Sequence, residues 1–265
     1  MQFAKINNVN LHYQVIGAPE GKPVLVFSNS LGTDFRIWRD VIVRLVGDFA
    51  VVAYDKRGHG LSDAPAAPYR MADHIADLAG LLDHLDVKDA LVCGLSVGGM
   101  IAQGLALGRP DLVKALVLCD TGHKIGTDTL WNERISIVEK NGIESIAENI
   151  MTRWFSQEYR TPDNPEFMGY RNMLTRTPVQ GYVGTSHAIR DTDYTQQVPT
   201  IDVPTLCIVG SEDGSTPPEL VSELSSLIPG ALFEMIDGAG HLPCIEKPEE
   251  FSNLIQPFLK KVASE

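Results

Sequence analysis

Short apolar runs alternate with amphipathic segments along most of this chain, and no other feature of the sequence constrains the fold as strongly. Six runs are rich in branched residues and almost free of charge, as are strands buried on both faces of a sheet. They are residues 24–28, 50–54, 90–93, 115–119, 205–209 and 232–236. The helix-like segments between them are residues 36–46, 72–85, 97–108, 217–227 and 248–262. This order predicts the α/β class, with a mostly parallel central sheet covered by helices on both faces.

The chain opens with a different pattern. Residues 3–7 and 11–16 predict a β-hairpin across the turn-prone Asn7-Asn8 pair. The first ten residues lack the basic and then apolar pattern of a secretory signal, and no apolar run approaches the roughly 18 residues that span a bilayer. We therefore expect a cytoplasmic protein that does not enter a membrane.

The interval between the fourth and fifth apolar runs is far longer than a simple crossover between parallel strands needs. Residues 129–139 and 143–154 have helical periodicity, and Asn141-Gly142 is a turn signal between them. We therefore expect residues 122–190 to form a helical cap, or lid, inserted between two parts of the α/β core. These two parts are residues 1–121 and 191–265.

The charge balance limits the partners. With 22 Lys and Arg against 34 Asp and Glu, the formal net charge is −12. Such a chain is unsuited to binding the phosphate backbone of a nucleic acid, so we expect no nucleic-acid partner. An anionic small substrate would need a locally positive pocket.

Residues 94–98, Gly-Leu-Ser-Val-Gly, form a G-x-S-x-G motif between an apolar run and a helix-like segment. A sharp strand-to-helix turn there exposes the serine hydroxyl, and small flanking residues let the strand and the helix approach closely. The alternative is a serine that only caps the following helix. The context favours Ser96 as a nucleophile.

A serine hydroxyl needs a base to accept its proton. Of the seven histidines, His241 follows Gly238-Ala239-Gly240 just beyond the last apolar run, in a loop able to reach Ser96. The other six histidines fit structural or solvated positions, or could at most contact substrate. Those in structural or solvated positions are His12, His59, His74 and His84, and those in the insertion that could at most contact substrate are His123 and His187.

The base in turn needs a carboxylate that fixes its tautomer. Asp213 follows the run 205–209 and gives the order Ser96, Asp213, His241, which is the order in α/β-hydrolases and not in chymotrypsin-like or subtilisin-like proteases. Two alternatives remain open for the acid. Asp120 ends the preceding strand, and Glu212 is adjacent to Asp213 but points another way from the loop.

An oxyanion hole requires two fixed donors near the serine. One is the backbone N–H of Val97, directly after the nucleophile. The other comes from the loop after the run 24–28, where Leu31 is the expected donor and Asn29 is expected to order the loop.

Metal and cofactor signatures are not found in the sequence. There is no H-E-x-x-H, no Cys/His cluster, no P-loop and no G-x-G-x-x-G after the first strand, so we expect neither a metal nor a cofactor. Cys93, Cys119 and Cys207 lie within apolar runs, where cysteine serves as a small buried hydrophobe rather than in a disulfide.

Together these motifs resemble the α/β-hydrolase superfamily over the whole chain, through NSLG, DKRGHGLSD, GLSVGG, GSED and GAGH. More narrowly, the chain is similar to the 3-oxoadipate enol-lactonases of aromatic-compound catabolism. This narrower resemblance rests on SNSLGTD at residues 28–34, on DKRGHGLSDAP with CGLSVGGMIAQGLAL, and on KIGTDTLWNERISIV and RWF in the insertion.

The resemblance implies a carboxylic ester hydrolase of the β-ketoadipate pathway. Its substrate would be a five-membered enol lactone with an acetate side chain, and its product 3-oxoadipate. Ser96 would attack the ring carbonyl with His241 as its base, the ring would open by expelling an enolate, and water would cleave the acyl-enzyme.

Three other functions remain as alternatives. One is a carboxylesterase for other small esters, and another is a cofactor-free haloperoxidase or perhydrolase relative with the same triad. The third is a receptor-like protein that binds a lactone without turning it over. Ser96 argues against an epoxide hydrolase or a dehalogenase, because both need Asp at that position.

The acetate side chain is ionised at neutral pH and needs a cation if it is buried under the cap. Arg134 lies three residues after Trp131 on one expected helix, so the two side chains share a face. We expect Trp131, Arg134 and Trp154 to bind substrate. Arg153 and Lys124 are alternative partners for the carboxylate.

Overall fold

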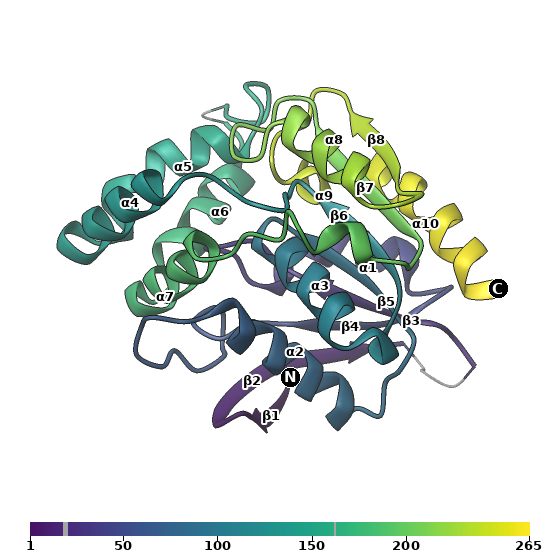
Figure 1. The fold of residues 1–265 in the computed structure, drawn as a ribbon. Coiled ribbons are helices and arrows are strands. Elements are labelled where there is room, and N and C mark those ends of the chain that lie inside the picture. Colours follow the sequence, from purple (N-terminus) through teal and green to yellow (C-terminus); the bar gives the residue numbers. More distant parts are fainter. Residues whose placement is uncertain (18–20, 162) are drawn as a thin grey trace.

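The computed structural model describes residues 1–17, 21–161 and 163–265. In this part of the chain, eight strands form one sheet in the order β1-β2-β4-β3-β5-β6-β7-β8 (Figure 1). The pairs β1–β2 and β2–β4 are antiparallel and the other pairs are parallel, which confirms the predicted mostly parallel sheet. The strands are β1 (Gln2–Ile6), β2 (Val9–Ile16), β3 (Val24–Ser28), β4 (Ala50–Tyr54), β5 (Ala90–Leu95), β6 (Val113–Cys119), β7 (Thr205–Gly210) and β8 (Leu232–Ile236).

Helices cover both faces of the sheet, as predicted. The helix α1 packs against α10 and α2 packs against α3, and these pairs lie on opposite faces (Figure 1). The α-helices are α1 (Arg39–Leu45), α2 (Met71–His84), α3 (Val97–Gly108), α4 (Asp128–Asn141), α5 (Ala147–Trp154), α6 (Pro165–Thr175), α7 (Val179–Arg190), α8 (Pro218–Leu227), α9 (Pro243–Glu246) and α10 (Pro248–Ser264). Short 3₁₀ helices are η1 (Phe35–Trp38), η2 (Pro110–Leu112), η3 (Ile143–Ile146) and η4 (Val198–Thr200).

The opening hairpin is confirmed, and its turn explains the asparagine pair. Asn7 and Asn8 have φ values of 49° and 64°. Two consecutive residues with positive φ make the turn that matches the twist of a hairpin, and asparagine tolerates this conformation better than most residues. The hairpin joins the parallel strands through the antiparallel pairing of β2 with β4.

The central strands are buried on both faces, but the prediction is wrong for β8. Every residue of β4, β5 and β7 is buried. In β8, by contrast, Leu232, Phe233 and Met235 are exposed. The physical reason is the place of β8 at the end of the sheet, where β7 is its one neighbouring strand.

Between β6 and β7 the chain forms α4, η3, α5, α6 and α7, which lie together at the left of Figure 1, coloured teal to green. Gly142, with φ 76°, ends α4, so the helix stops at the turn signal that the sequence showed. Because η3 precedes α5, the helical periodicity of residues 143–154 corresponds to two short helices rather than one. Likewise, η1 and α1 divide the segment 36–46.

No helix in the described part of the chain is both long enough and apolar enough to cross a bilayer. All four cysteines are buried and free. Cys93 and Cys119 lie on the neighbouring strands β5 and β6, with their sulfur atoms 3.9 Å apart.

Candidate active site

Ser96 occupies the sharp turn between β5 and α3 that its motif predicts. Its backbone has φ 58° and ψ −121°, a strained conformation for a residue other than glycine. The turn is crowded, because a Cβ on Gly98 would lie 2.1 Å from the Ser28 carbonyl oxygen and one on Gly94 would lie 2.3 Å from the Gly98 carbonyl oxygen. The flanking glycines therefore let α3 approach the strands, and the serine projects from the carboxyl end of β5.

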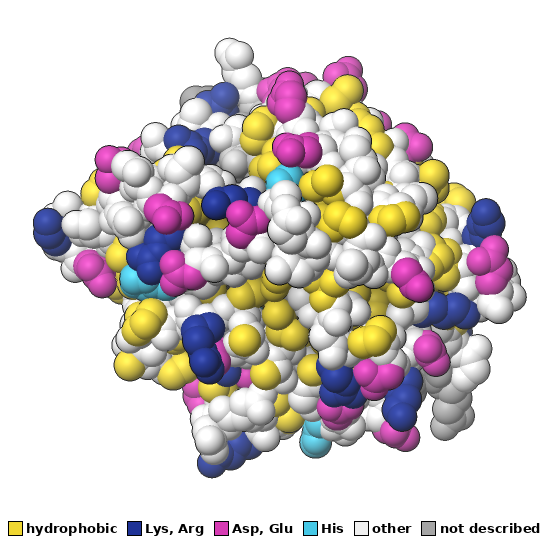
Figure 2. Space-filling model, in the orientation of Figure 1, with side chains coloured by type: hydrophobic (Ala, Val, Ile, Leu, Met, Phe, Trp, Pro, Cys, Tyr) yellow, Lys and Arg dark blue, Asp and Glu magenta, His cyan; other side chains and the backbone are white. Residues whose placement is uncertain are grey.

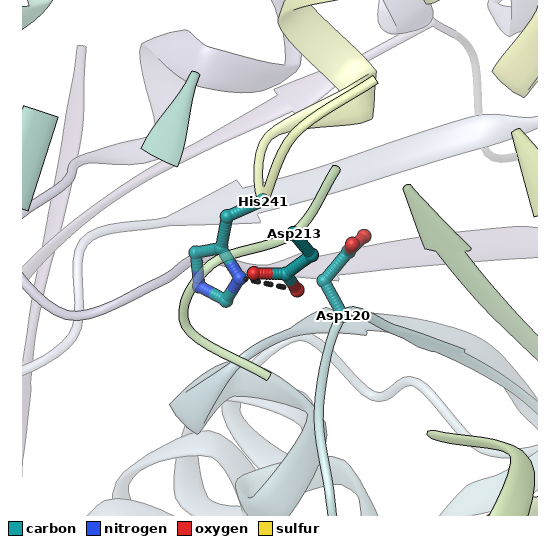
Figure 3. Close-up of side chains that lie close together, drawn as sticks. All are labelled: Asp120, Asp213 and His241. Atoms are coloured by element: carbon teal, nitrogen blue, oxygen red, sulfur yellow. Dashed lines mark hydrogen bonds and ion pairs between the residues drawn. The ribbon is translucent and has the colours of Figure 1, made fainter. Parts of the chain in front are cut away.

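His241 and Asp213 are hydrogen bonded to each other. The His241 Nδ1 atom lies 2.9 Å from Asp213 Oδ2, and both side chains are buried (Figure 3). They come from two loops, one after β7 and one after β8, which the parallel strands bring to the same edge of the sheet. With Nδ1–H donating to the carboxylate, Nε2 of the neutral imidazole is the nitrogen able to accept a proton.

Asp213 is held in place by three further donors. Its Oδ1 accepts from the backbone N–H groups of Ser215 and Thr216 at 2.7 and 3.0 Å, and its Oδ2 accepts from the Thr216 hydroxyl at 2.6 Å. Burial alone would raise the pKa of Asp213, but the neighbouring His241 and these hydrogen bonds lower it below its ordinary value. The carboxylate therefore stays ionised at neutral pH.

Asp120, one of the two alternatives for the acid, lies beside this pair but is not bonded to the imidazole. Its Oδ1 accepts from the Gly210 N–H at 2.9 Å, whereas its Oδ2 is buried without a partner among the described residues. Burial raises the pKa of Asp120 well above its ordinary value, and the Asp213 carboxylate raises it further. Glu212, the other alternative, accepts from the Gln157 N–H at 3.4 Å.

Asp120, Asp213 and His241 also form a group that could hold a metal ion. In the described part of the chain, one potential ligand atom from each of these side chains lies within 4.8 Å of the other two. The hydrogen bond between Asp213 and His241 already uses the Nδ1 atom that such an ion would need. The arrangement therefore suits a base with its orienting carboxylate better than a metal centre.

Ser96 and His241 line the same small cavity, of about 60 Å³. No hydrogen bond joins the Ser96 hydroxyl to the imidazole among the interactions of the described residues. In the absence of substrate, catalytic hydrogen bonds are commonly long and tighten only in the complex. The two side chains nevertheless face one space.

The loop after β3 forms one wall of this cavity, through Ser30 and Leu31. Among the described residues, the Leu31 N–H has no hydrogen-bond partner, and the Val97 N–H, as the first of α3, has no preceding helix carbonyl. The Asn29 side chain donates to the Thr33 carbonyl at 2.6 Å, so it orders the loop as expected. Two free N–H groups near Ser96 are what an oxyanion hole requires.

His59 supports the same loop from the DKRGHG turn. Its Nε2 accepts from the Gly32 N–H at 3.0 Å, and its Nδ1 is 3.2 Å from the Arg57 carbonyl oxygen. Burial lowers the pKa of His59 well below its ordinary value, so the ring stays neutral and can accept this bond. The other histidines outside the site do not line the small cavity: His12, His74, His84, His123 and His187.

The opposite wall comes from the helical segment between β6 and β7. Trp131, Arg134 and Trp154, which the sequence predicted as substrate contacts, all line the cavity, as does Arg153. The Arg134 guanidinium lies over the Trp131 ring, 4.7 Å from its centre. Neither arginine is ion-paired with a carboxylate in the described part of the chain.

Lys124, in contrast, is turned away. Its Nζ lies 3.2 Å from the Asp193 carboxylate, and it does not line the cavity. The cations that face the space next to Ser96 are therefore arginines.

Several cavity residues were not identified from the sequence. Thr216 bonds both Asp213 and, at 3.2 Å, His241 Nδ1. Its position three residues after Asp213, just before Pro217 and Pro218, is the spacing at which an acidic side chain caps a following turn, and this signal could have identified it. Tyr182 and Ile150 had no such signal, because α7 and α5 reach the site only through the fold.

A larger cavity, of about 460 Å³, is lined in part by residues 33–36. It contains the buried pair of His12 Nδ1 and Asp55 Oδ2, 2.8 Å apart. Its lining includes no serine or cysteine among the described residues, so the smaller cavity has the chemistry of a nucleophile with a base.

Comparison with known proteins identifies the family and the fold. The family model for the alpha/beta hydrolase fold matches residues 23–248. Two 3-oxoadipate enol-lactonases of Acinetobacter baylyi are 32% and 34% identical to the chain, over 96% and 93% of it and 94% and 92% of their own lengths. The crystal structure of the enol-lactonase from Burkholderia xenovorans LB400 superposes with a TM-score of 0.94 at 33% identity, covering 98% of this chain and all of that one.

Proposed function

This chain belongs to the alpha/beta hydrolase family, and from that premise we propose that it hydrolyses 3-oxoadipate enol-lactone to 3-oxoadipate in the β-ketoadipate pathway. It is a carboxylic ester hydrolase, as are the enol-lactonases to which it is similar. The observation that carries the substrate proposal is one small cavity that joins Ser96, His241 and the unpaired Arg134.

In the proposed mechanism, Ser96 Oγ attacks the lactone carbonyl while His241 Nε2 accepts its proton. Negative charge develops on the carbonyl oxygen and is stabilised by the N–H groups of Leu31 and Val97. The ring C–O bond then breaks, and its oxygen leaves as an enolate. Asp213 keeps the imidazole in the correct tautomer and stabilises its charged form.

The second half of the reaction releases the product. The imidazolium returns its proton to the enolate, and the resulting enol rearranges to a ketone. A water molecule then gives a proton to His241 and attacks the acyl-enzyme, which frees Ser96 and leaves 3-oxoadipate. An enolate is a better leaving group than an alkoxide, so ring opening needs no metal in this scheme.

We propose that the substrate acetate lies against the helical segment. Charged side chains of both signs are interspersed over the face seen in Figure 2, and the net charge is −12, so attraction for an anion has to be local. Arg134 and Arg153 supply it. In this proposal residues 122–190 act as a cap over a core of residues 1–121 and 191–265, with Trp131 and Trp154 closing the site around the lactone ring.

The direct test is to mix the purified protein with the enol lactone and follow the loss of its ultraviolet absorbance. We expect loss well above the spontaneous rate, with 3-oxoadipate as the product. A rate no higher than the spontaneous one would contradict the proposed substrate. Faster turnover of small uncharged esters than of the lactone would instead identify a general carboxylesterase.

A further inference from the structure

A lysine is buried directly beneath the proposed oxyanion loop. Lys56 follows β4 and is only 1% exposed. Its Nζ donates to the Ser30 carbonyl oxygen at 2.5 Å and lies 3.5 Å from the Thr33 carbonyl oxygen. Burying an ammonium group is costly, so the position of Lys56 against this loop requires a physical explanation.

The bonded oxygen belongs to a particular peptide group. The Ser30 carbonyl and the Leu31 N–H are the two ends of one planar amide. The same oxygen also accepts from the Thr33 hydroxyl at 3.0 Å and from the Thr33 N–H at 3.3 Å. One end of the amide is therefore held by several donors, while its N–H is free at the cavity wall.

We propose that the Lys56 ammonium orients and polarises the Ser30–Leu31 peptide, so that the Leu31 N–H becomes a stronger donor to the oxyanion. A cation at the carbonyl oxygen draws electron density from the amide nitrogen and makes the N–H more positive. Hydrogen bonds that share a group strengthen one another in this way. Lys56 is thus a positioning residue, which acts on the transition state through the peptide and does not touch substrate.

The charges around Lys56 are consistent with this role. Asp34 and Asp55 are the acidic groups near it, but their carboxylates bond Arg36 and His12, and the Lys56 hydrogen bonds go to carbonyl groups. Two histidines, His59 and His74, are also near the ammonium, and burial keeps both rings neutral. Burial lowers the pKa of Lys56 to about 7, and the two carboxylates limit the fall.

This inference rests on the proposed function, because it assigns Leu31 to the oxyanion hole. The test compares Lys56→Met, which keeps the stem and removes the donor, with Lys56→Gln, which keeps a neutral donor. Thr33→Val is the matched control, because it removes an uncharged donor from the same oxygen.

Two measurements separate the transition state from the ground state. Trifluoroacetone adds to the serine to form a tetrahedral oxyanion, which fluorine NMR detects, whereas KM for the enol lactone reports binding before the oxyanion forms. For Lys56→Met we expect the affinity for trifluoroacetone and kcat/KM to fall together by about 10- to 100-fold, less than the ~100- to 1,000-fold of a lost oxyanion donor. KM for the enol lactone should stay within about 2-fold, so that the loss falls on kcat. Lys56→Gln should lose less affinity for trifluoroacetone than Lys56→Met, and Thr33→Val should lose least.

A rise in KM as large as the loss of trifluoroacetone affinity would overturn the inference, because Lys56 would then only hold the loop together. Unchanged trifluoroacetone affinity in both Lys56 variants would overturn it as well. If Lys56→Met does not fold, Lys56→Gln decides by the same comparison. A wild-type protein that binds trifluoroacetone but leaves the enol lactone intact would refute the proposed substrate and not the role of Lys56. In that case kcat and KM of the Lys56 variants are measured with p-nitrophenyl acetate.

Discussion

Two carboxyl groups lie side by side at the site, and their pKa values are shifted in opposite directions. Asp213 accepts hydrogen bonds from Thr216, Ser215 and His241, and its pKa is lowered despite burial. Asp120 accepts one bond, from the Gly210 N–H, and burial raises its pKa well above the ordinary value. The neighbouring His241, and after it the hydrogen bonds from Thr216 and Ser215, lower the pKa of Asp213, so this is the carboxylate able to stabilise an imidazolium.

Replacing each acid by its amide tests this difference. Asp213→Asn keeps the shape but gives His241 the wrong hydrogen-bond partner, so we expect kcat to fall by roughly 10⁴-fold. Asp120→Asn replaces a carboxyl group that is not bonded to His241 and whose pKa is raised, so kcat should fall by less than about 10-fold. Steady-state kinetics of both variants give the ranking, and the reverse ranking would move the acid to the end of β6.

The proposed nucleophile has its own test. Ser96→Ala removes the attacking oxygen while leaving the oxyanion donors, so activity should fall by about 10³-fold or more. A serine-directed phosphonate should label the parent protein, as read by mass spectrometry, and not the variant. More than about a tenth of the parent activity in Ser96→Ala would exclude this nucleophile.

The pH dependence of Lys56 follows from its lowered pKa. The ammonium predominates below about pH 7 and the neutral amine above it, because burial lowers the pKa from its ordinary value to about 7. The advantage of the parent over Lys56→Gln in kcat/KM should therefore shrink as the pH rises through this range. Taking the ratio of the two proteins cancels every pH effect that they share. A ratio that stays constant from about pH 6 to about pH 9 would contradict the prediction.

At the scale of elements, the junction of β5 with α3 depends on glycine for contact rather than for flexibility. A Cβ on Gly98 would lie 2.1 Å from the Ser28 carbonyl oxygen, an atom of the β3 backbone that cannot move aside as a side chain does. The close packing of α3 on β3 and β5 is what holds the strained Ser96 turn. Any side chain at this position must push the helix away from the sheet.

Gly98→Ala should therefore destabilise the fold. Overpacking of this kind costs about 1–3 kcal/mol, measurable as a lower unfolding temperature and a lower denaturation midpoint. Gly108→Ala is the matched control, because it lies at the other end of α3, where a Cβ meets nothing within 4 Å. It should be neutral or slightly stabilising, since alanine favours helix over glycine. Equal stability of the two variants would show that α3 can shift without cost.

For the molecule as a whole, the distribution of the charged residues matters more for binding an anion than the net charge does. The net charge of −12 repels a substrate anion, whereas Arg134 and Arg153 face the cavity from α4 and α5 without an ion-pair partner among the described residues. Ser96, Asp213 and His241 each follow a strand of the sheet. The two arginines belong to helices between β6 and β7. In the proposed function, catalysis and recognition are thus supplied by different parts of the chain.

Arg134→Ala should raise KM for the charged lactone by roughly 10- to 100-fold, as expected for a lost hydrogen bond to a charged group. Hydrolysis of an uncharged ester of similar size should change little. Lys124→Ala is the control from the same segment, because Lys124 pairs with Asp193 outside the cavity. Equal losses on both substrates would mean that Arg134 holds the helices together through Trp131 and does not bind the carboxylate.

Local patterns were sufficient to predict much of this protein. The apolar runs predicted the buried strands, because a strand that is buried on both faces is a short run of apolar residues. Each segment contains this pattern by itself. The residues Ser96, Asp213 and His241 were identified because each follows a strand, and parallel strands bring their carboxyl ends to one edge. Asn7 and Asn8 marked their turn through the conformations that their own side chains tolerate.

Only the tertiary structure decided what depends on contacts between distant segments. The exposure of β8 follows from its place at the end of the sheet, which no residue of Leu232–Ile236 encodes. The packing of α4 and α5 decides that Arg134 and Arg153 line the cavity and that Lys124 does not. The bond from Lys56 to the Ser30 carbonyl joins loops 26 residues apart in sequence. A side chain's neighbours across the fold are set by the packing of whole elements, and no local pattern carries that information.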